Sequence, residues 1–259
     1  MTEGPAALTI KPGEYLGKPR LKLLLAGLTP ADDDSSSNSA SSLYLRPGEV
    51  RAFLSQRAGD QTDWAAQLTL TGRAALDSDT GLVGLRAGSK GLIIIPPFPV
   101  LADQQLSQWD AAPLLQLLAA EYTIGVVLLR LGRFSVAVYH GEKLVSSKTD
   151  ARYVKGRHRA GGTSQRRFER IREGQMRRIY DKTCLAVRAQ FEPHAGQINY
   201  VFLGGERLTL NGFLNVCPHM VQFRARTLAR LLNIRDPKRD TLEAVGQMLG
   251  QCRVYPVQW

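Results

Sequence analysis

Two adjacent glycines and a nearby glutamine form the stretch of this sequence that is best equipped for chemistry. Gly161 and Gly162 permit a backbone path that other residues avoid, and they leave main-chain N–H groups unshielded. Thr163 and Ser164 separate them from Gln165, whose amide can accept a hydrogen bond from a water molecule and donate one. These groups could position a water for attack on a carbonyl and stabilise the negative charge that develops on its oxygen. None of them is a strong base, so the chemistry would depend on positioning and electrostatics.

The same stretch carries most of the excess positive charge of the chain. Between Lys148 and Arg178 there are eleven Lys and Arg residues and three acids, so this window contributes eight of the eleven net positive charges. Charge concentrated in this way is typical of a surface that binds a polyanion such as RNA, although a solvated helix face is the ordinary alternative. The candidate RNA-binding residues are Arg152, Lys155, Arg157, His158, Arg159, Arg166, Arg167 and Arg170.

A projecting loop followed by a helix must position these groups. The basic loop, residues 150–165, is polar and is longer than a simple connection between elements needs to be. Apolar residues then recur at helical intervals, while arginines occupy the other faces. We predict a helix that begins close to Ser164, because serine suits the N-cap position. The apolar positions are Phe168, Ile171, Met176, Ile179 and Val187.

The elements around the loop predict a sheet covered by helices. Apolar or alternating segments with turns at Gly132 and Gly141 predict a three-stranded meander before the loop, and the helix from Ser164 would pack back across it. Residues 240–249 begin with capping-box spacing and predict a final helix, whereas residues 227–234 allow a strand or a helix. We predict strands at residues 122–129, 134–139, 143–148 and 199–203.

The run from Gly161 to Arg172 resembles the Gly-Gly-Gln loop and following helix of eukaryotic and archaeal peptide-chain release factors. It is still more similar to Vms-type release-factor-like proteins, whose glutamine comes later, in a Gly-x-x-Gln arrangement. Residues 162–165 fit that variant without a gap, whereas Thr163 stands where the orthodox motif has its glutamine. The resemblance covers roughly residues 122–250 and is densest over residues 134–190.

The resemblance implies a fold and an activity. It implies an α/β (α+β) protein whose RNase H-like central domain has a mixed sheet, and it favours a strand at residues 227–234. It implies a codon-independent peptidyl-tRNA hydrolase that releases nascent peptide from stalled or split ribosomes in ribosome rescue and quality control, with the large ribosomal subunit and peptidyl-tRNA as partners. The catalytic residues by this resemblance are Gly161, Gly162, Thr163, Ser164 and Gln165.

Two other activities stay open. A protein of the same shape could cut tRNA near its 3′ CCA end without a metal, through attack of a ribose 2′-hydroxyl on the adjacent phosphate. The chain could also be a ribosome-binding or RNA-binding module without catalysis. Two-metal nuclease chemistry is disfavoured, because the three strands offer only Glu142 and Asp150 as carboxylates. We therefore expect no metal and no cofactor.

The first part of the chain predicts a separate module. We expect a small α/β N-terminal module over residues 1–110, with a mobile acidic and serine-rich loop near residues 31–41, and the release-factor domain over residues 111–259, opening with a helix at residues 112–121. Within the module we predict strands at residues 42–45 and 91–95, strands or short segments at residues 68–71 and 81–85, and a helix at residues 50–56.

The cysteines and hydropathy indicate the compartment. Cys184, Cys217 and Cys252 are widely spaced, which argues against a zinc site and a disulfide framework and fits a reducing cytoplasm. The sequence has neither an apolar run of membrane-spanning length nor the pattern of a signal peptide. We expect a soluble, cytoplasmic monomer that does not bind membranes.

Overall fold

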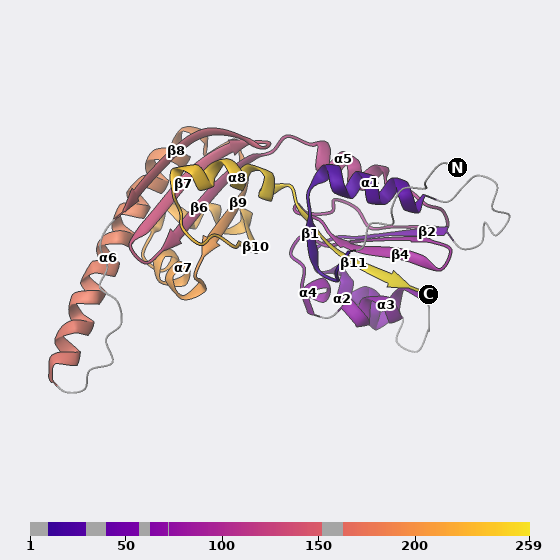
Figure 1. The fold of residues 1–259 in the computed structure, drawn as a ribbon, viewed down its shortest axis with the longest axis horizontal. Coiled ribbons are helices and arrows are strands. Elements are labelled where there is room, and N and C mark those ends of the chain that lie inside the picture. The colour runs from indigo at the N-terminus through magenta and orange to yellow at the C-terminus, as the bar shows by residue number, and fades with distance from the viewer. Residues whose placement is uncertain (1–9, 30–39, 57–62, 72, 152–162) are drawn as a thin grey trace, which may run out of the picture. The chain divides into compact units, whose positions relative to one another are not determined.

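The computed structural model divides the chain into two compact units (Figure 1). It describes residues 10–29, 40–56, 63–71, 73–151 and 163–259. One unit consists of Met1–Ala120 with Gly250–Trp259, and the other is Glu121–Leu249. Each contains one sheet with helices packed on it, which confirms the mixed α/β class. None of the described helices is long and apolar enough to span a membrane.

The first unit contains a six-stranded sheet in the order β1-β11-β4-β3-β2-β5, in which every pair of neighbouring strands is antiparallel. Buried side chains form a core cluster on each side of it, one around Leu21 and Leu114 and the other around Trp64 and Leu68. The strands are β1 (Glu14–Leu16), β2 (Ala40–Leu45), β3 (Leu82–Ala87), β4 (Lys90–Ile95), β5 (Gln104–Leu106) and β11 (Cys252–Gln258). The helices are α1 (Lys18–Leu28), α2 (Glu49–Gln56), α3 (Asp63–Thr71), α4 (Arg73–Leu76) and α5 (Ala112–Ala119).

The strands and helices predicted in the first part of the chain are present, except at residues 68–71. That segment is the end of helix α3, in which Trp64 and Leu68 are both buried at a spacing of one helical turn. The hydroxyl of Thr69 donates to the carbonyl of Ala65, another contact of helical spacing. Four alternating residues were too short a pattern to separate a strand from a helix end. The predicted acidic loop falls largely on residues 30–39, which lie outside the described residues, and Ala40 already belongs to β2.

The boundary between the units differs from the expected division after residue 110. Helix α5 packs with the first unit through the buried Leu114 and Leu118, so the boundary follows Ala120. The chain also returns to the first unit at its C-terminal end, where β11 pairs with β4 along six residue pairs. A pairing between residues so far apart in the chain leaves no local signal in the sequence.

The second unit contains the predicted mixed sheet, in the order β10-β9-β6-β7-β8. Strands β6, β7 and β8 form the antiparallel meander, and β9 and β10 run parallel to β6. This is the RNase H-like arrangement that the family resemblance implied. The strands are β6 (Thr123–Arg130), β7 (Arg133–His140), β8 (Lys143–Ala151), β9 (Ile198–Gly205) and β10 (Thr227–Leu232). The helical segments are α6 (Thr163–Phe191), η2 (Glu192–His194), α7 (Arg207–Leu214), η3 (Pro218–Arg226) and α8 (Arg239–Leu249).

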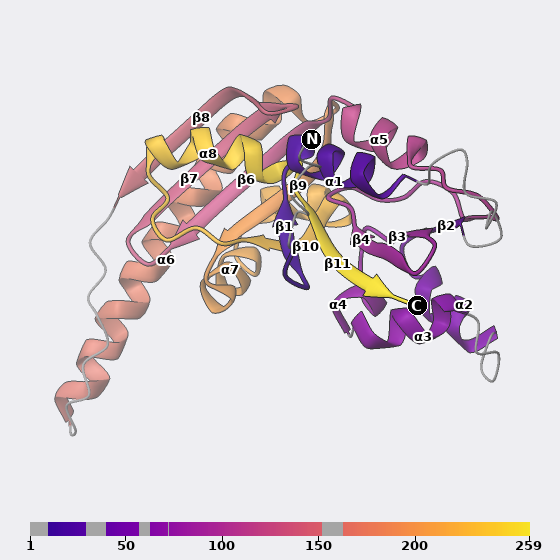
Figure 2. The same cartoon turned by 45° about the vertical axis from the view of Figure 1, so that its right-hand side comes forward.

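Strand β7 shows how the sheet of the second unit is covered on both faces. Its residues Phe134, Val136 and Val138 belong to the core shared with α6 and α7. Tyr139 points to the other face, where its hydroxyl donates to the carbonyl of Leu242 in α8 at 2.7 Å. Figure 2 shows α8 on one side of the strands and α6 on the other. Burial raises the pKa of Tyr139, so its phenol keeps this hydrogen bond even in alkaline solution that ionises an exposed tyrosine.

A disulfide contradicts the inference from the wide spacing of the cysteines, which argued against a disulfide framework. Cys184 on α6 and Cys217 before η3 are bonded, with Cα atoms 5.3 Å apart, and Cys252 is buried and takes no part in this disulfide. The two partners are 33 residues apart in the sequence and meet only because α6 packs against the segment that follows α7. Their spacing alone gave no sign of that contact.

The close approach of α8 to the hairpin between β7 and β8 gives a first prediction. A Cβ atom at Gly246 would lie 2.3 Å from the backbone oxygen of Glu142, so Gly246→Ala requires the helix or the hairpin to shift. We expect it to lower the free energy of unfolding by about 1–3 kcal/mol. Urea denaturation followed by circular dichroism measures the change.

A second helical glycine supplies the control. A Cβ atom at Gly174 in α6 would have nothing within 4 Å, so Gly174→Ala should stabilise the chain by about 0.4–1 kcal/mol. Equal stability of the two variants would contradict the tight packing of α8.

Candidate functional site

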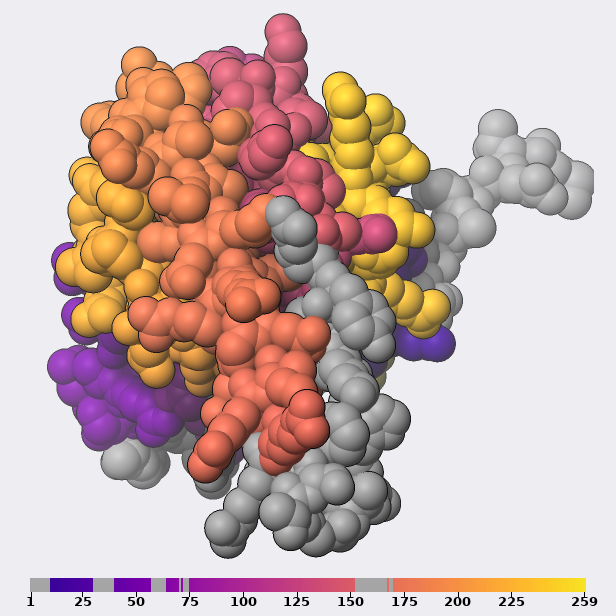
Figure 3. Space-filling model, turned by 90° about the vertical axis from the view of Figure 1, so that its left-hand side faces the viewer, coloured from indigo at the N-terminus to yellow at the C-terminus, as the bar shows by residue number. Residues whose placement is uncertain are grey.

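The predicted site lies where β8 ends and α6 begins. Strand β8 ends at Ala151 and α6 starts at Thr163, and Figure 3 looks onto the face of the molecule that carries this helix. Several predicted site residues lie between these two positions and therefore outside the described residues. They are Arg152, Lys155, Arg157, His158, Arg159, Gly161 and Gly162.

Helix α6 is 29 residues long and consists of two parts with different surroundings. Its first part, Thr163–Arg178, has no buried residue among those whose burial is described, and the first buried side chain is Ile179. Figures 1 and 2 show this part extending away from the sheet of its own unit. At 1.5 Å per residue it is roughly 24 Å long. We call Thr163–Arg178 the arm.

The second part of α6 anchors the arm in the core. Ile179, Val187 and Phe191 are almost completely buried, and the Phe191 ring packs edge-on against Phe223 with centroids 5.3 Å apart. The disulfide described above ties the same part to the segment after α7. Tyr180 is also buried there, and burial raises its pKa although the nearby Arg172 opposes the shift. The arm therefore projects from a rigid base.

An ion pair connects α6 to the strand that leads into the loop. The Lys182 ammonium lies 3.4 Å from the carboxylate of Asp150, one residue before the end of β8. Both side chains are partly exposed, so the pair contributes no more than about 1 kcal/mol to stability. The contact joins the start of the loop to the anchored part of the helix. The sequence identifies Asp150 as a carboxylate but does not reveal this ion pair, because Lys182 is 32 residues away in the chain.

The arm is strongly positive. It contains six arginines and two glutamates. Among the ion pairs of the described residues, one involves an arm arginine: the carboxylate of Asp181 lies 3.3 Å from Arg177. This single pair leaves most of the positive charge of the arm in excess. The predicted RNA-binding residues Arg167 and Arg170 are exposed on the arm, and Arg166 also lies in it. A rod of this charge and reach suits contact with phosphates of a folded RNA.

The predicted catalytic residues Thr163, Ser164 and Gln165 occupy the first turn of α6. The helix begins one residue before Ser164, so Ser164 lies inside the first turn and the predicted N-cap role is wrong. The first N–H groups of a helix have no partner within the helix, and the aligned peptide dipoles give this end a partial positive charge. Gln165 therefore lies at an end of the arm where developing negative charge is favoured.

The described residues offer no group of three or more His, Cys, Asp or Glu side chains that could hold a metal ion. Residues 161–165 themselves carry one side-chain amide, two hydroxyls and backbone N–H groups, and Arg166 and Arg167 follow them in the sequence.

Sequence comparison relates this domain to translation factors. A model of the family described as Actinobacteria/chloroflexi VLRF1 release factor matches residues 122–254. Peptide chain release factor subunit 1 of Methanosphaera stadtmanae is 31% identical over 109 residues, which make up 42% of this chain and 26% of that protein. The same subunit of Archaeoglobus fulgidus is 28% identical over 138 residues, or 52% of this chain and 34% of that protein. The chain thus spans about a quarter to a third of the length of these relatives.

Two solved structures also show similarity to the chain. The crystal structure of the archaeal translation termination factor aRF1 covers 90% of this chain and 73% of its own, with a TM-score of 0.36 and 17% identity. The Vms1 mitochondrial localization core covers 85% of this chain and 92% of its own, with a TM-score of 0.38 and 13% identity.

Proposed function

Because the chain belongs to the Actinobacteria/chloroflexi VLRF1 release factor family, we propose that it is a peptidyl-tRNA hydrolase of ribosome rescue and quality control. In this proposal it acts in the cytoplasm as a monomer on large ribosomal subunits that carry peptidyl-tRNA, without reading a codon. The observation that carries the proposal is the arm: an exposed, arginine-rich helix anchored in a rigid domain, with Gln165 in its first turn.

The arm would deliver its tip to the 3′ end of the tRNA. Arg167 and Arg170 are exposed there, and each would neutralise a phosphate as the arm enters an RNA-lined space. The residues of the preceding loop, Arg157, His158 and Arg159 among them, would add contacts closer to the tip. These contacts hold the arm in register and carry no sequence information, which suits action on many different stalled tRNAs.

Release at the tip would be ester hydrolysis. Water attacks the carbonyl carbon of the ester between the peptide and the terminal ribose, and negative charge develops on the carbonyl oxygen. Gln165 would hold the attacking water, and N–H groups beside Gly161 and Gly162 would donate to the oxyanion. The tetrahedral intermediate then collapses to the peptide carboxylate and the ribose hydroxyl of an intact tRNA. The rate enhancement would come from positioning and preorganised donors, without a strong base.

The substrate preference gives the test of this function. We expect peptide release from isolated large subunits that carry peptidyl-tRNA. On assembled ribosomes, we expect the same rate of release whether the codon is a stop codon or a sense codon. A rate that rises specifically with a stop codon would contradict codon-independent action. Absence of release on every substrate, with binding retained, would contradict the enzymatic proposal itself.

The arm arginines give a separate prediction about binding. Replacing Arg167 and Arg170 together by alanine removes two exposed cations, and we expect the slope of log affinity for large subunits against log salt to become shallower by about two. Filter binding at several salt concentrations measures it. The matched control replaces Arg188 and Arg224, which are exposed outside the arm, by alanine. Equal changes in both double variants would show that the arm has no special part in binding.

A further inference from the structure

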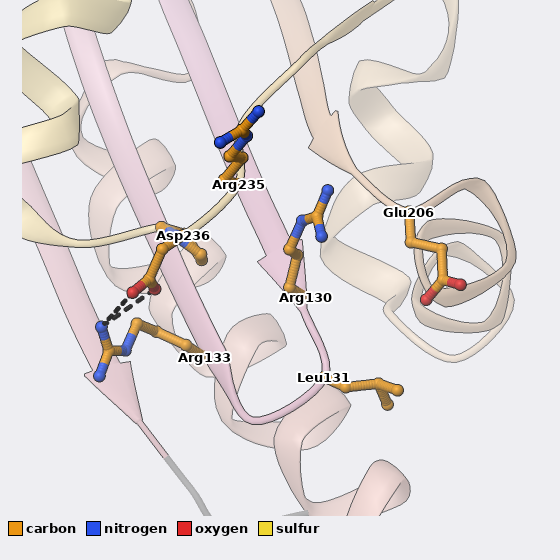
Figure 4. Close-up of a pocket in the computed structure, with 7 residues that line it drawn as sticks. Arg130, Leu131, Arg133, Glu206, Arg235 and Asp236 are labelled. Atoms are coloured by element: carbon orange, nitrogen blue, oxygen red, sulfur yellow. Dashed lines mark hydrogen bonds and ion pairs between the residues drawn. The ribbon is translucent and has the colours of Figure 1, made fainter. Parts of the chain in front are cut away.

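A pocket in the second unit, with no residue of the arm in its lining, is lined mainly by charged residues (Figure 4). It has a volume of about 520 Å³ and is formed by short segments between strands and helices. The lining residues are Arg130, Leu131, Arg133, Glu206, Arg235, Asp236 and Pro237.

The topology of the sheet explains why these residues meet. Strands β6, β9 and β10 are parallel neighbours, so their carboxyl ends lie at one edge of the sheet. Arg130 is the last residue of β6, Glu206 follows the end of β9, and Arg235 follows the end of β10. Ligands of open α/β sheets bind outside the carboxyl ends of parallel strands. The pocket is therefore at a position where such a fold is suited to hold a ligand.

The contacts inside the pocket leave positive charge available. Arg133 donates to both carboxylate oxygens of Asp236 at 3.0 Å, and the Lys238 ammonium lies 3.2 Å from the same carboxylate. Asp236 is thus shared by two cations. The carboxylate of Glu206 accepts a hydrogen bond from the hydroxyl of Thr209 at 3.0 Å. Both acids of the lining already have partners on the chain.

The other two arginines are open to a ligand. Arg130 donates from Nε to the carbonyl of Ile234 at 2.8 Å, which fixes its side chain while its terminal nitrogens remain for other acceptors. Arg235 is exposed and has no ion pair or hydrogen bond with any other described residue. Figure 4 shows Arg133 turned to Asp236, whereas Arg130 and Arg235 turn away from that pair. Two guanidinium groups on one pocket repel each other unless an anion lies between them.

We propose that this pocket binds a phosphate group of an RNA strand and is a second RNA contact besides the arm. Planar guanidinium groups match the oxygens of a phosphate. Five of the seven lining residues are charged, and the pocket opens to solvent at Glu206 and Arg235, unlike the apolar, enclosed sites that bind small organic molecules. Arg207 and Arg239, which lie one residue after Glu206 and two residues after Pro237 in the chain, are also exposed and offer further cations to a strand that carries several phosphates.

The choice of RNA as the source of the phosphate rests on the proposed ribosomal function. Arg235→Gln removes a cation of the pocket without breaking any hydrogen bond or ion pair among the described residues. We expect it to weaken binding of the full chain to large ribosomal subunits roughly tenfold and to make the salt slope shallower by about one. Arg224→Gln, an exposed arginine outside the pocket, changes the net charge equally and should leave both values near wild type.

The same measurements distinguish the pocket from the arm. Loss of affinity in Arg170→Gln but not in Arg235→Gln would overturn the pocket as an RNA contact and leave the proposed function intact. Equal behaviour of Arg235→Gln and Arg224→Gln would also overturn it, because the effect would be one of net charge. Titration of the full chain with inorganic phosphate, measured by calorimetry, tests the other source of the phosphate. Saturable phosphate binding that Arg235→Gln abolishes, while the affinity of this variant for large subunits stays at the wild-type value, would assign the pocket to a free anion instead.

Discussion

Replacement of Gln165 by alanine is expected to slow peptide release from large subunits by about two to three orders of magnitude, the usual cost of removing one group that stabilises a developing oxyanion or holds the attacking water. Gln165 lies in the first turn of α6, at the end of the arm. Alanine favours a helix more than glutamine does, so the substitution does not weaken the helix itself. Binding to the subunit should persist, because the arginines of the arm are unchanged.

A second glutamine in the same helix provides the matched control. Gln175 lies ten residues further along α6, about 15 Å along the helix axis from Gln165. Gln175→Ala makes the same chemical change outside the tip, and we expect its release rate to stay close to wild type. Single-turnover release under saturating enzyme separates the chemical step from binding. Full activity of Gln165→Ala, or equal losses in both variants, would show that the assigned role of Gln165 is wrong.

The largest effect on stability is expected from Phe191→Ala. The Phe191 side chain is 1% exposed and packs edge-on against Phe223, at the point where the anchored part of α6 ends. Its ring also fills the space above Gly125 of β6, where a Cβ atom would come within 2.7 Å of it. Removal of the ring leaves a cavity between the helix and the sheet, and we expect the free energy of unfolding to fall by about 3–5 kcal/mol.

Phe191→Leu tests whether the cavity is the cause. Leucine restores most of the lost volume, so its destabilisation should be well below that of alanine, at about 1–1.5 kcal/mol. Both values come from urea denaturation curves of the full chain, read at a probe that reports the second unit. If the alanine variant lost less free energy of unfolding than the leucine variant, the Phe191 ring would not be what holds α6 on the sheet.

The sheet of the second unit was predictable because a short local pattern marks each strand of its meander. Each strand of the meander is a short apolar or alternating segment closed by a turn, so the chain itself marks where β6, β7 and β8 begin and end. The strand at residues 227–232 required the family resemblance, since its pattern fits a helix as well. The resemblance itself is confirmed by the match of the family model to residues 122–254.

Long-range contacts were the part that the sequence did not reveal. The return of β11 to the first unit, the disulfide between Cys184 and Cys217, and the pairing of Lys182 with Asp150 all join residues from distant segments. Each depends on how finished elements pack, and no local pattern encodes that packing. The pocket arginines were missed for the same reason, because Arg130 and Arg235 come from the ends of different strands.

The candidate site was predictable in its charge and only partly in its placement. The excess of arginine around residues 148–178 is visible in the sequence, and the structure places Arg167 and Arg170 exposed on the arm. The projection of the arm was not visible, because it depends on the point at which the helix leaves the core, at Ile179. The predicted roles of Gly161 and Gly162 lie outside the described residues and stay predictions.

The measurement that tests the central proposal most directly is the length of the tRNA after release. Isolated large subunits carry a peptidyl-tRNA labelled at the tRNA 5′ end and in the peptide, and the products are separated after reaction with the wild-type chain or with Gln165→Ala. Ester hydrolysis predicts free peptide together with full-length tRNA that no longer carries peptide. With Gln165→Ala, the peptidyl-tRNA should remain unreacted. Shortened tRNA, with peptide still attached to 3′-terminal nucleotides, would contradict ester hydrolysis and assign the chain to cleavage of the tRNA itself.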